Sequence, residues 1–227
     1  MPDWTAPQRP ADHAEETLVA AIMDDTYPPG TQLPGERALA AQLGVTRPTL
    51  REALQRLERD GWLTIHQGKP TVINDFWREG GLNVLSTIVR YDQQLPPGFV
   101  THLLEVRLLM APDYARAAVE HDPANVQAHL AQYPNLEETA TAYTAFDWDL
   151  HYILTIASGN PIHPLILNGF ATLYEQVGSR YFTLAAARAA SRDFYRALLE
   201  ACEQRDASAA ERITREVMAN SIELWQR

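Results

Sequence analysis

Two threonines and two arginines gather at the start of one predicted helix. Thr46, Arg47, Thr49 and Arg51 open a segment in which leucine and alanine recur at helical spacing. Hydroxyl groups near a helix N-terminus can hydrogen-bond phosphate oxygens, and an arginine guanidinium can donate two hydrogen bonds to one guanine. Residues of these types at this spacing therefore predict a helix whose N-terminal end reads the major groove of DNA.

A shorter helix is predicted immediately before this one. Glu36 favours a helix start just after Pro34, and Gly44 supplies the left-handed residue that ends a helix. Thr46 is expected to cap the second helix, and Pro48 fits its first turn, where a missing N–H costs little. The apolar face of the second helix carries residues at positions i, i+3, i+4 and i+7: Leu50, Ala53, Leu54 and Leu57. The pattern predicts a helix-turn-helix.

A small β-hairpin is predicted directly after the second helix. Residues 62–65 and 71–73 are short β-prone runs on either side of a polar turn. His66, Gln67 and Lys69 are placed at the tip of this hairpin, where Gly68 allows a positive φ or a close approach to DNA. The two helices and the hairpin together predict a winged helix-turn-helix.

The charge of the chain is unevenly distributed. The net charge of the 227 residues is −10, which by itself argues against a nucleic-acid partner. Residues 47–69, however, hold five basic and three acidic residues, whereas residues 79–227 hold 11 basic and 18 acidic residues. Positive charge is thus concentrated on the predicted DNA-reading segment, and the acidic remainder should discourage nonspecific contacts with DNA.

The sequence also predicts a cytoplasmic chain that has no membrane partner. No apolar run approaches the roughly 20 residues of a membrane helix, and the N-terminus lacks the pattern of a signal peptide. The single cysteine, Cys202, cannot form an internal disulfide, which fits a reducing compartment. We expect Cys202 to be a small buried apolar residue.

The rest of the chain is predicted to be helical, so the fold class is mostly α. We expect a winged helix-turn-helix over residues 1–73, a linker over 74–81 with its hinge at Gly80 and Gly81, and a helical regulatory domain over 82–227. Asp206 is the expected N-cap of the last helix. The expected architecture of the second domain is an all-helical bundle of six or seven helices. The predicted helices are 82–91, 98–120, 123–131, 136–157, 162–182, 187–204 and 207–225.

Polar residues on apolar helix faces mark a candidate binding region in the second domain. Arg107 lies in a mostly apolar segment, so it either pairs with a carboxylate or awaits an anionic ligand. Ser221 lies one turn before Trp225 on the predicted core side of the last helix. Asp147 and His151 share a helix face and could form half of a metal site. Two ligands do not make a closed metal site, so we expect no metal and a buried, hydrogen-bonded imidazole at position 151.

Residues 12–73 resemble the N-terminal domain of GntR-family transcription regulators. The residues that carry the resemblance are Leu33, Pro34, Glu36, Arg37, Leu39, Gly44, Val45, Thr46, Arg47, Thr49, Arg51, Glu52, Leu54, Leu57 and Gly61. The resemblance implies that DNA is contacted by Arg37, Thr46, Arg47, Thr49 and Arg51, and by the wing around Gly68. The chain departs from the family at two places. Gln67 stands where a minor-groove histidine is expected, with His66 one position earlier, and Pro48 replaces a possible hydroxyl contact.

Segments of the wing, the linker and the helical domain resemble regulators of fatty-acid metabolism, which belong to the FadR-type branch of the same family. The segments that carry this resemblance are 61–65, 68–71, 74–77, 81–85, 157–162, 165–169, 173–174 and 181–182. The resemblance implies a homodimer that binds a palindromic operator, represses degradation genes, activates unsaturated fatty-acid synthesis genes and leaves DNA on binding long-chain acyl-CoA. This effector would be the ligand, with no cofactor. The implied effector-binding residues are Leu104, Arg107, Tyr181, Ser221 and Trp225.

Two other interpretations stay open at this point. One is a repressor of the same branch that responds to a metal or an organic acid. Many members of that branch hold a metal with one aspartate and three histidines, but Tyr195 and Val217 stand where two of those histidines are expected. The other is a helical enzyme that acts on acyl-CoA. Neither Cys202 nor Ser221 has a histidine near it in sequence, so we expect no catalytic residue.

Overall fold

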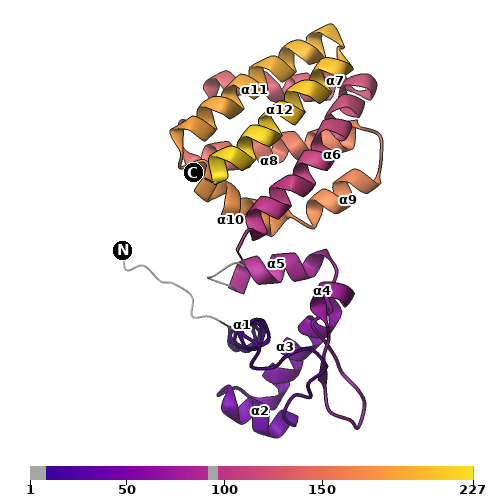
Figure 1. Ribbon diagram of the computed structural model, residues 1–227, viewed down its shortest axis with the longest axis vertical. Helices are drawn as coiled ribbons and strands as arrows, with labels where there is room; N and C mark the ends of the chain where they lie inside the picture. Colours follow the sequence, from indigo (N-terminus) through magenta and orange to yellow (C-terminus); the bar gives the residue numbers. More distant parts are fainter. Residues whose placement is uncertain (1–8, 92–96, 227) are drawn as a thin grey trace. The chain divides into compact units, whose positions relative to one another are not determined.

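The structure is a computed structural model that describes residues 9–91 and 97–226. By their internal contacts, the residues fall into two compact units, 1–94 and 95–227 (Figure 1). The N-terminal unit combines helices with one two-stranded sheet, and the C-terminal unit is helical throughout the described part. No helix of the described residues is long and apolar enough to cross a membrane. The expected mostly α fold class is confirmed.

The N-terminal unit has the predicted winged helix-turn-helix. Gly44 has a φ of 66° at the turn between the two predicted helices. The side chain of Thr46 accepts a hydrogen bond from the Thr49 backbone N–H at 3.3 Å and so caps the second helix. The predicted apolar face of that helix is buried. The elements of the unit are α1 (Pro10–Met23), α2 (Glu36–Gln42), α3 (Arg47–Asp60), β1 (Leu63–Thr64), β2 (Val72–Ile73), α4 (Phe76–Glu79) and α5 (Leu82–Tyr91).

The wing is a short antiparallel hairpin. Leu63 pairs with Ile73 and Thr64 with Val72, so the strands are shorter than the β-prone runs. Gly68 has the positive φ expected of it, 70°, and the side chains at the tip of the hairpin are exposed. The wing therefore presents its tip to solvent while Leu63 and Ile73 are buried in the core of the unit.

Two helices of the N-terminal unit differ from the expected organisation. The residues predicted to be a linker include α4, whose Phe76 is buried against Trp62 with ring centroids 4.7 Å apart. A Cβ atom at Gly80 would lie 2.5 Å from the Phe76 carbonyl oxygen, so this glycine permits close packing. The helix expected to open the second domain, α5, contacts α1 and belongs to the N-terminal unit by its contacts.

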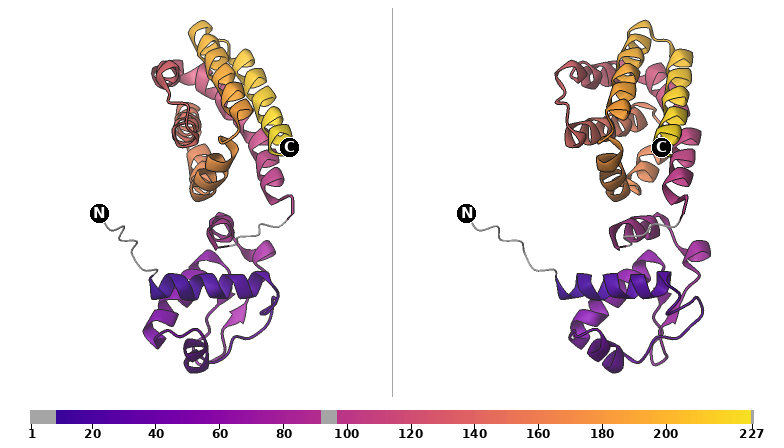
Figure 2. Two further views of the ribbon diagram at one scale, coloured as in Figure 1. Left: turned by 90° about the vertical axis from the view of Figure 1, so that its left-hand side faces the viewer. Right: turned by 60° about the vertical axis from the view of Figure 1, so that its left-hand side comes forward.

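The C-terminal unit is a bundle in which α6 lies along α12 and α11 lies on the other side of α12 (Figure 2). Helix α8 contacts α6 and α10, and α7 bridges α8 and α11. The buried side chains of these helices form one apolar core. The helices are α6 (Phe99–His121), α7 (Pro123–Leu130), α8 (Ala140–Ala157), α9 (Ile162–Asn168), α10 (Ala171–Tyr181), α11 (Ala185–Gln204) and α12 (Ala207–Trp225).

Two predicted helices of this bundle were wrong in extent. The helix expected over 136–157 begins only at Ala140, because Thr139 caps it by accepting a hydrogen bond from the Ala142 N–H at 3.2 Å. The helix expected over 162–182 is two helices. Gly169 and Phe170 bond to the carbonyls three residues back, a tighter turn that ends α9 before α10 begins. The predicted cap at Asp206 is confirmed.

Candidate functional site

The candidate DNA-binding residues lie on one side of the N-terminal unit. An open groove between α2, α3 and the wing is lined by Arg37, Arg47, Arg51, His66 and Gly68. These five residues are exposed. Thr49, another predicted DNA-contacting residue, is half-exposed. The groove thus joins the start of α3 to the wing, as winged-helix recognition of DNA requires.

The two threonines and the remaining wing residue complete this face. The hydroxyls of Thr46 and Thr49 lie 2.8 Å apart at the N-terminus of α3, where backbone N–H groups point outward. Gln67 is exposed at the wing tip next to Gly68. The structure brings the predicted DNA-contacting residues together on one face, and their contacts with DNA stay a prediction.

Glu36 is an acidic residue within this basic groove. Its carboxylate accepts hydrogen bonds from Arg51 Nε at 2.9 and 3.0 Å and lies 2.8 Å from Arg51 Nη2. Arg47 Nη2 lies 3.4 Å from the same carboxylate. The hydrogen bond from Arg51, together with its charge, holds the pKa of Glu36 below the usual value. Arg47 and Arg51 therefore share one negative charge, that of Glu36.

Two of the five basic residues counted in segment 47–69 serve the fold of the unit. Arg56 forms ion pairs with Asp12, Glu15 and Glu52 at 2.6–3.3 Å and so ties α3 to α1. Arg59 donates a hydrogen bond to Asp60 at 3.0 Å. The other three basic residues, Arg47, Arg51 and Lys69, line the groove, and that they face DNA stays a prediction.

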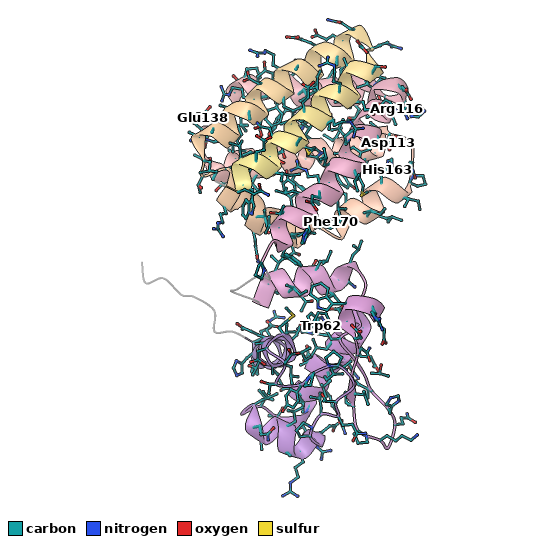
Figure 3. All side chains as sticks on the ribbon, in the orientation of Figure 1. Trp62, Asp113, Arg116, Glu138, His163 and Phe170 are labelled. Carbon is teal, nitrogen blue, oxygen red and sulfur yellow. The ribbon has the colours of Figure 1, made fainter. Side chains whose placement is uncertain are left out.

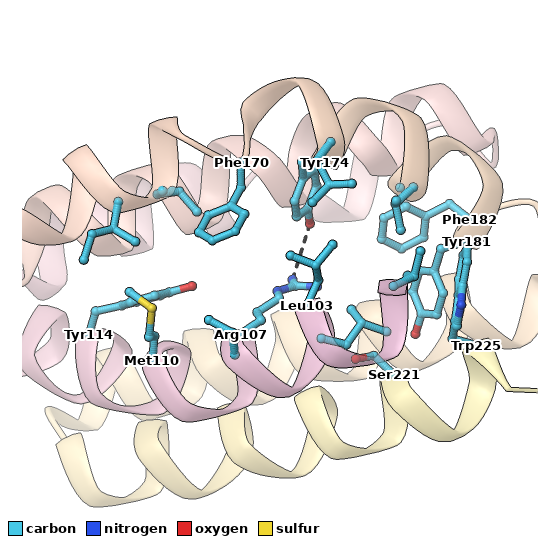
Figure 4. A pocket seen from close by; sticks show the side chains of 18 of the residues that line it. Leu103, Arg107, Met110, Tyr114, Phe170, Tyr174, Tyr181, Phe182, Ser221 and Trp225 are labelled. Atoms are coloured by element: carbon cyan, nitrogen blue, oxygen red, sulfur yellow. Dashed lines mark hydrogen bonds between the residues drawn. The ribbon is translucent and has the colours of Figure 1, made fainter. Parts of the chain in front are cut away.

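The five predicted effector-binding residues line one cavity of the C-terminal unit (Figure 4). Leu104 and Arg107 come from α6, Ser221 and Trp225 from α12, and Tyr181 from the end of α10. The other walls are mostly apolar side chains of α6, α9 and α10. The cavity is partly open, and its volume is about 100 Å³. This volume is well below the roughly 300–1,000 Å³ typical of ligand pockets, so a large ligand must part the helices.

A buried polar network lies behind the wall of this cavity and reaches it through Arg107, Tyr114 and Tyr174. Arg107 Nη2 lies 2.9 Å from Asp147 Oδ2 and 2.6 Å from His151 Nε2. Tyr174 donates its hydroxyl hydrogen to Asp147 Oδ2, and Tyr195 donates to Asp147 Oδ1 at 2.9 Å. Of the two predicted alternatives for Arg107, pairing with a carboxylate is therefore the one that the structure shows.

The electrostatics of the network leave one charge on each partner of the ion pair. Burial would raise the pKa of Asp147, but the adjacent His151 and Arg107 and the hydroxyls of Tyr174 and Tyr195 hold this pKa below its usual value. Burial and the Arg107 charge lower the pKa of His151 to about 3. His151 is therefore neutral near pH 7. It accepts from Arg107 at Nε2, so its Nδ1 carries the hydrogen that it donates to the Tyr114 hydroxyl at 2.7 Å.

These contacts settle the predicted role of His151 as a fully buried, hydrogen-bonded imidazole. Asp147 and His151 do share a helix face, with Oδ2 and Nε2 3.7 Å apart. Within residues 9–91 and 97–226 no three histidine, cysteine or acidic residues cluster as metal ligands would. Tyr195, which stands where the branch often has a metal-binding histidine, instead donates its hydroxyl to Asp147.

Three residues of this site were not predicted as members of it. Tyr174 and Tyr195 supply hydroxyls to the buried aspartate. Tyr195 was marked only as standing in place of a metal-binding histidine, and no local pattern marks Tyr174. Arg180, an exposed residue of α10, lies over the indole ring of Trp225 at 5.2 Å from the ring centroid. In the described part of the chain Arg180 has no ion pair. The cavity thus has a paired cation inside and an unpaired cation at its Trp225 end.

A serine–histidine pair lies at the opposite end of the cavity, and its geometry is not that of an activated nucleophile. His163 lines the cavity, with Nδ1 2.9 Å from Ser158 Oγ and Nε2 4.0 Å from Asp113 (Figure 3). Ser158 Oγ also donates to the Thr155 carbonyl oxygen at 2.7 Å. The serine hydrogen is therefore engaged by the backbone and not directed at the imidazole. Cys202 is fully buried as predicted, and burial raises the pKa of its thiol to about 12.

Comparison with known proteins decides the family. Residues 10–73 match the gntR family of bacterial regulatory proteins, and residues 74–227 match the FadR C-terminal domain. The chain belongs to the GntR family and its FadR branch. The fatty acid metabolism regulator protein of Shewanella amazonensis is 44% identical over 218 residues, which cover 96% of this chain and 91% of that protein.

Further relatives agree with this assignment. The fatty acid metabolism regulator protein of Yersinia enterocolitica is 46% identical over 198 residues, which cover 87% of this chain and 83% of that protein. A solved structure of Lar, described as controlling the agr system of Listeria monocytogenes, has a TM-score of 0.64 at 17% identity and shares the fold over 99% of both chains. The chain is a GntR-family transcription regulator and not an enzyme.

Proposed function

We propose that this FadR-type chain regulates fatty-acid metabolism and that long-chain acyl-CoA releases it from operator DNA. In this proposal it acts in the cytoplasm as a homodimer on a palindromic operator. It represses degradation genes and activates genes of unsaturated fatty-acid synthesis. The observation that carries the proposal is the mostly apolar cavity of the FadR C-terminal domain, which gathers all five predicted effector-binding residues.

The charges around the cavity favour an apolar chain with an anionic head. Inside, the Arg107 charge is balanced by Asp147 at 2.9 Å, so the interior presents little net charge to an alkyl chain. At the Trp225 end, the Arg180 guanidinium is exposed and has no ion pair within the described residues. An acyl chain would lie between α6 and α10, and the phosphates of coenzyme A would lie near Arg180.

The small volume of the cavity supports a conformational response. A cavity of about 100 Å³ cannot take a long acyl chain unless one wall moves. Helix α9 has no buried residue, and only Leu173 and Gly178 are buried in α10. These two helices are therefore the wall that yields at the lowest cost. Ligand binding would favour the open arrangement, and DNA affinity falls if that arrangement holds the two DNA-binding units at the wrong spacing.

The Ser221→Asn variant tests the position of the ligand. Asparagine at this buried position of α12 adds bulk and an amide to the cavity wall. We expect calorimetry to show an affinity for oleoyl-CoA reduced at least tenfold. Ser221→Ala is the matched control, since the Ser221 hydroxyl donates to the Met218 carbonyl oxygen at 2.6 Å and alanine keeps the space open. Equal affinity of wild type and Ser221→Asn, both folded by circular dichroism, would remove Ser221 from the binding site.

A metal- or organic-acid-responsive regulator is the second interpretation, and no contact in the described residues favours it. Asp147 is hydrogen-bonded by Arg107, Tyr174 and Tyr195, and both nitrogens of His151 have partners. Metal analysis of the purified protein separates the two interpretations. Stoichiometric bound metal would favour the second.

A further inference from the structure

The pairing of Glu36 with the recognition arginines differs from the other ion pairs of the N-terminal unit. Its carboxylate lies inside the DNA-binding groove, where attraction to phosphate would favour positive charge only. Glu36 is partly exposed, with 34% of its side chain accessible, and Arg51 and Arg47 are more than half exposed. Because the two arginines are exposed to water, they do not need a carboxylate to neutralise a buried charge.

The geometry of the Glu36–Arg51 pair leaves one edge of the guanidinium free. The carboxylate takes Nε at 2.9 and 3.0 Å and Nη2 at 2.8 Å, the side edge of the arginine. Arg51 Nη1 has no partner in the described residues, and Nη2 keeps a second hydrogen. Two parallel donors at the end of the guanidinium are what a bidentate contact to guanine O6 and N7 uses. Arg51 can therefore contact a guanine while Glu36 holds its other edge.

We propose that Glu36 is a specificity-determining positioning residue of the DNA-binding face. The inference rests on the DNA-binding function of the family. A guanine edge is neutral, so an arginine that is already paired can still donate to it. A phosphate is an anion, and the nearby carboxylate weakens the attraction of Arg47 and Arg51 for it. Glu36 thus lowers the affinity for arbitrary DNA more than the affinity for the operator.

The experiment compares Glu36→Gln with wild type on two duplexes. One is an operator obtained by in vitro selection from random DNA with the wild-type chain, and the other has the same composition in scrambled order. Fluorescence anisotropy measures both affinities across a salt series. We expect Glu36→Gln to bind scrambled DNA about tenfold more tightly, with a steeper salt dependence by about one released ion. The ratio of operator to scrambled affinity should fall about tenfold.

Glu52→Gln is the matched control. Glu52 lies in α3, the helix that carries Arg47 and Arg51, and pairs with Arg56 at 2.6 Å. This substitution therefore changes the net charge equally without touching Arg47 or Arg51. We expect Glu52→Gln to keep the wild-type affinity ratio. A second variant, Glu36→Asp, keeps the charge but shortens the side chain. It should bind scrambled DNA as wild type does and lose operator affinity because Arg51 is no longer held.

The outcomes separate this inference from the proposed function. An affinity ratio in Glu36→Gln equal to that of Glu52→Gln, with both variants folded by circular dichroism, overturns the role of Glu36. If wild type itself does not distinguish the selected duplex from the scrambled one, sequence reading fails and the proposed function fails with it. A loss of stability without a change in the affinity ratio assigns Glu36 to the fold of α2 alone and also overturns the inference.

Discussion

Arg107 is a largely buried charge of the C-terminal unit, and its ion pair with Asp147 compensates for the lost hydration. Only 22% of its side chain is accessible and only 5% of that of Asp147, so loss of either partner would leave an unpaired buried charge. Tyr174 donates to the aspartate oxygen that Arg107 also contacts, and Tyr195 donates to the other oxygen. The sequence left open whether Arg107 binds a carboxylate or a ligand, because Asp147 is 40 positions away.

His151 makes the stability of this unit depend on pH. Its pKa is about 3 in the folded chain and near 6.5 when the chain is unfolded. The stabilisation is therefore complete above about pH 6.5 and is lost as the pH falls toward 3. We expect His151 to lower the free energy of unfolding by up to about 1.4 kcal/mol per pH unit over this range.

Urea unfolding at several pH values between 7 and 4 measures this slope. The His151→Gln variant keeps a polar side chain but does not titrate, so its free energy of unfolding should vary less with pH than that of wild type. His102→Gln, which removes an exposed histidine of α6, controls for the loss of one imidazole. The same slope in wild type and His151→Gln would show that His151 is not held neutral in the fold.

At the scale of elements, α10 is held against α8 by a glycine contact. A Cβ atom on Gly178 would lie 2.9 Å from Thr144 Cγ2, and Thr144 is buried. A β-branched side chain has few alternative rotamers, so the methyl group cannot easily move away. Gly178→Ala should therefore lower the free energy of unfolding by about 1–3 kcal/mol, even though alanine favours helix.

A double variant isolates this contact. Thr144→Ala removes the methyl group that Gly178→Ala would meet, so the double variant should recover most of the stability lost in the single variant Gly178→Ala. Urea denaturation of the two single variants and the double variant measures the coupling free energy. Additive effects, or a Gly178→Ala chain as stable as wild type, would mean that α10 does not depend on this close approach.

The sequence predicted elements best where the signals are local. Thr46, Asp206 and Gly44 act on backbone groups within a few residues, so the ends of α3 and α12 and the turn before α3 were predicted correctly. The prediction of a single helix over 162–182 was wrong because the apolar spacing continues through Gly169. There the backbone hydrogen bonds change to a tighter turn, which ends α9.

The residues that line the cavity were easier to predict than the contacts that they make. All five effector-binding residues expected from the family resemblance line the cavity, because the fold aligns their helices. Tyr195 meets Asp147 across 48 positions of sequence, and Arg180 meets Trp225 from another helix. No spacing rule connects such pairs. Glu36 was assigned to the start of α2, and its pairing with the arginines of α3 became visible only in the structure.

At the scale of the whole molecule, the proposed function couples a DNA-binding face in the N-terminal unit to an effector cavity in the C-terminal unit. Thermodynamic linkage requires that if acyl-CoA weakens operator binding, operator DNA weakens acyl-CoA binding by the same factor. The cavity of about 100 Å³ is too narrow for a long acyl chain. The ligand would therefore bind more tightly to a conformation in which the cavity is wider. A ligand that fits both arrangements equally would have no effect on DNA affinity.

The most direct test is the operator affinity of the wild-type chain with and without oleoyl-CoA. Fluorescence anisotropy with a selected operator duplex measures this affinity, and coenzyme A without an acyl chain is the control. We predict that saturating oleoyl-CoA lowers operator affinity at least tenfold, while coenzyme A alone leaves it unchanged. Operator affinity that stays the same at saturating oleoyl-CoA would contradict the account, because the cavity and the DNA-binding face would then be uncoupled.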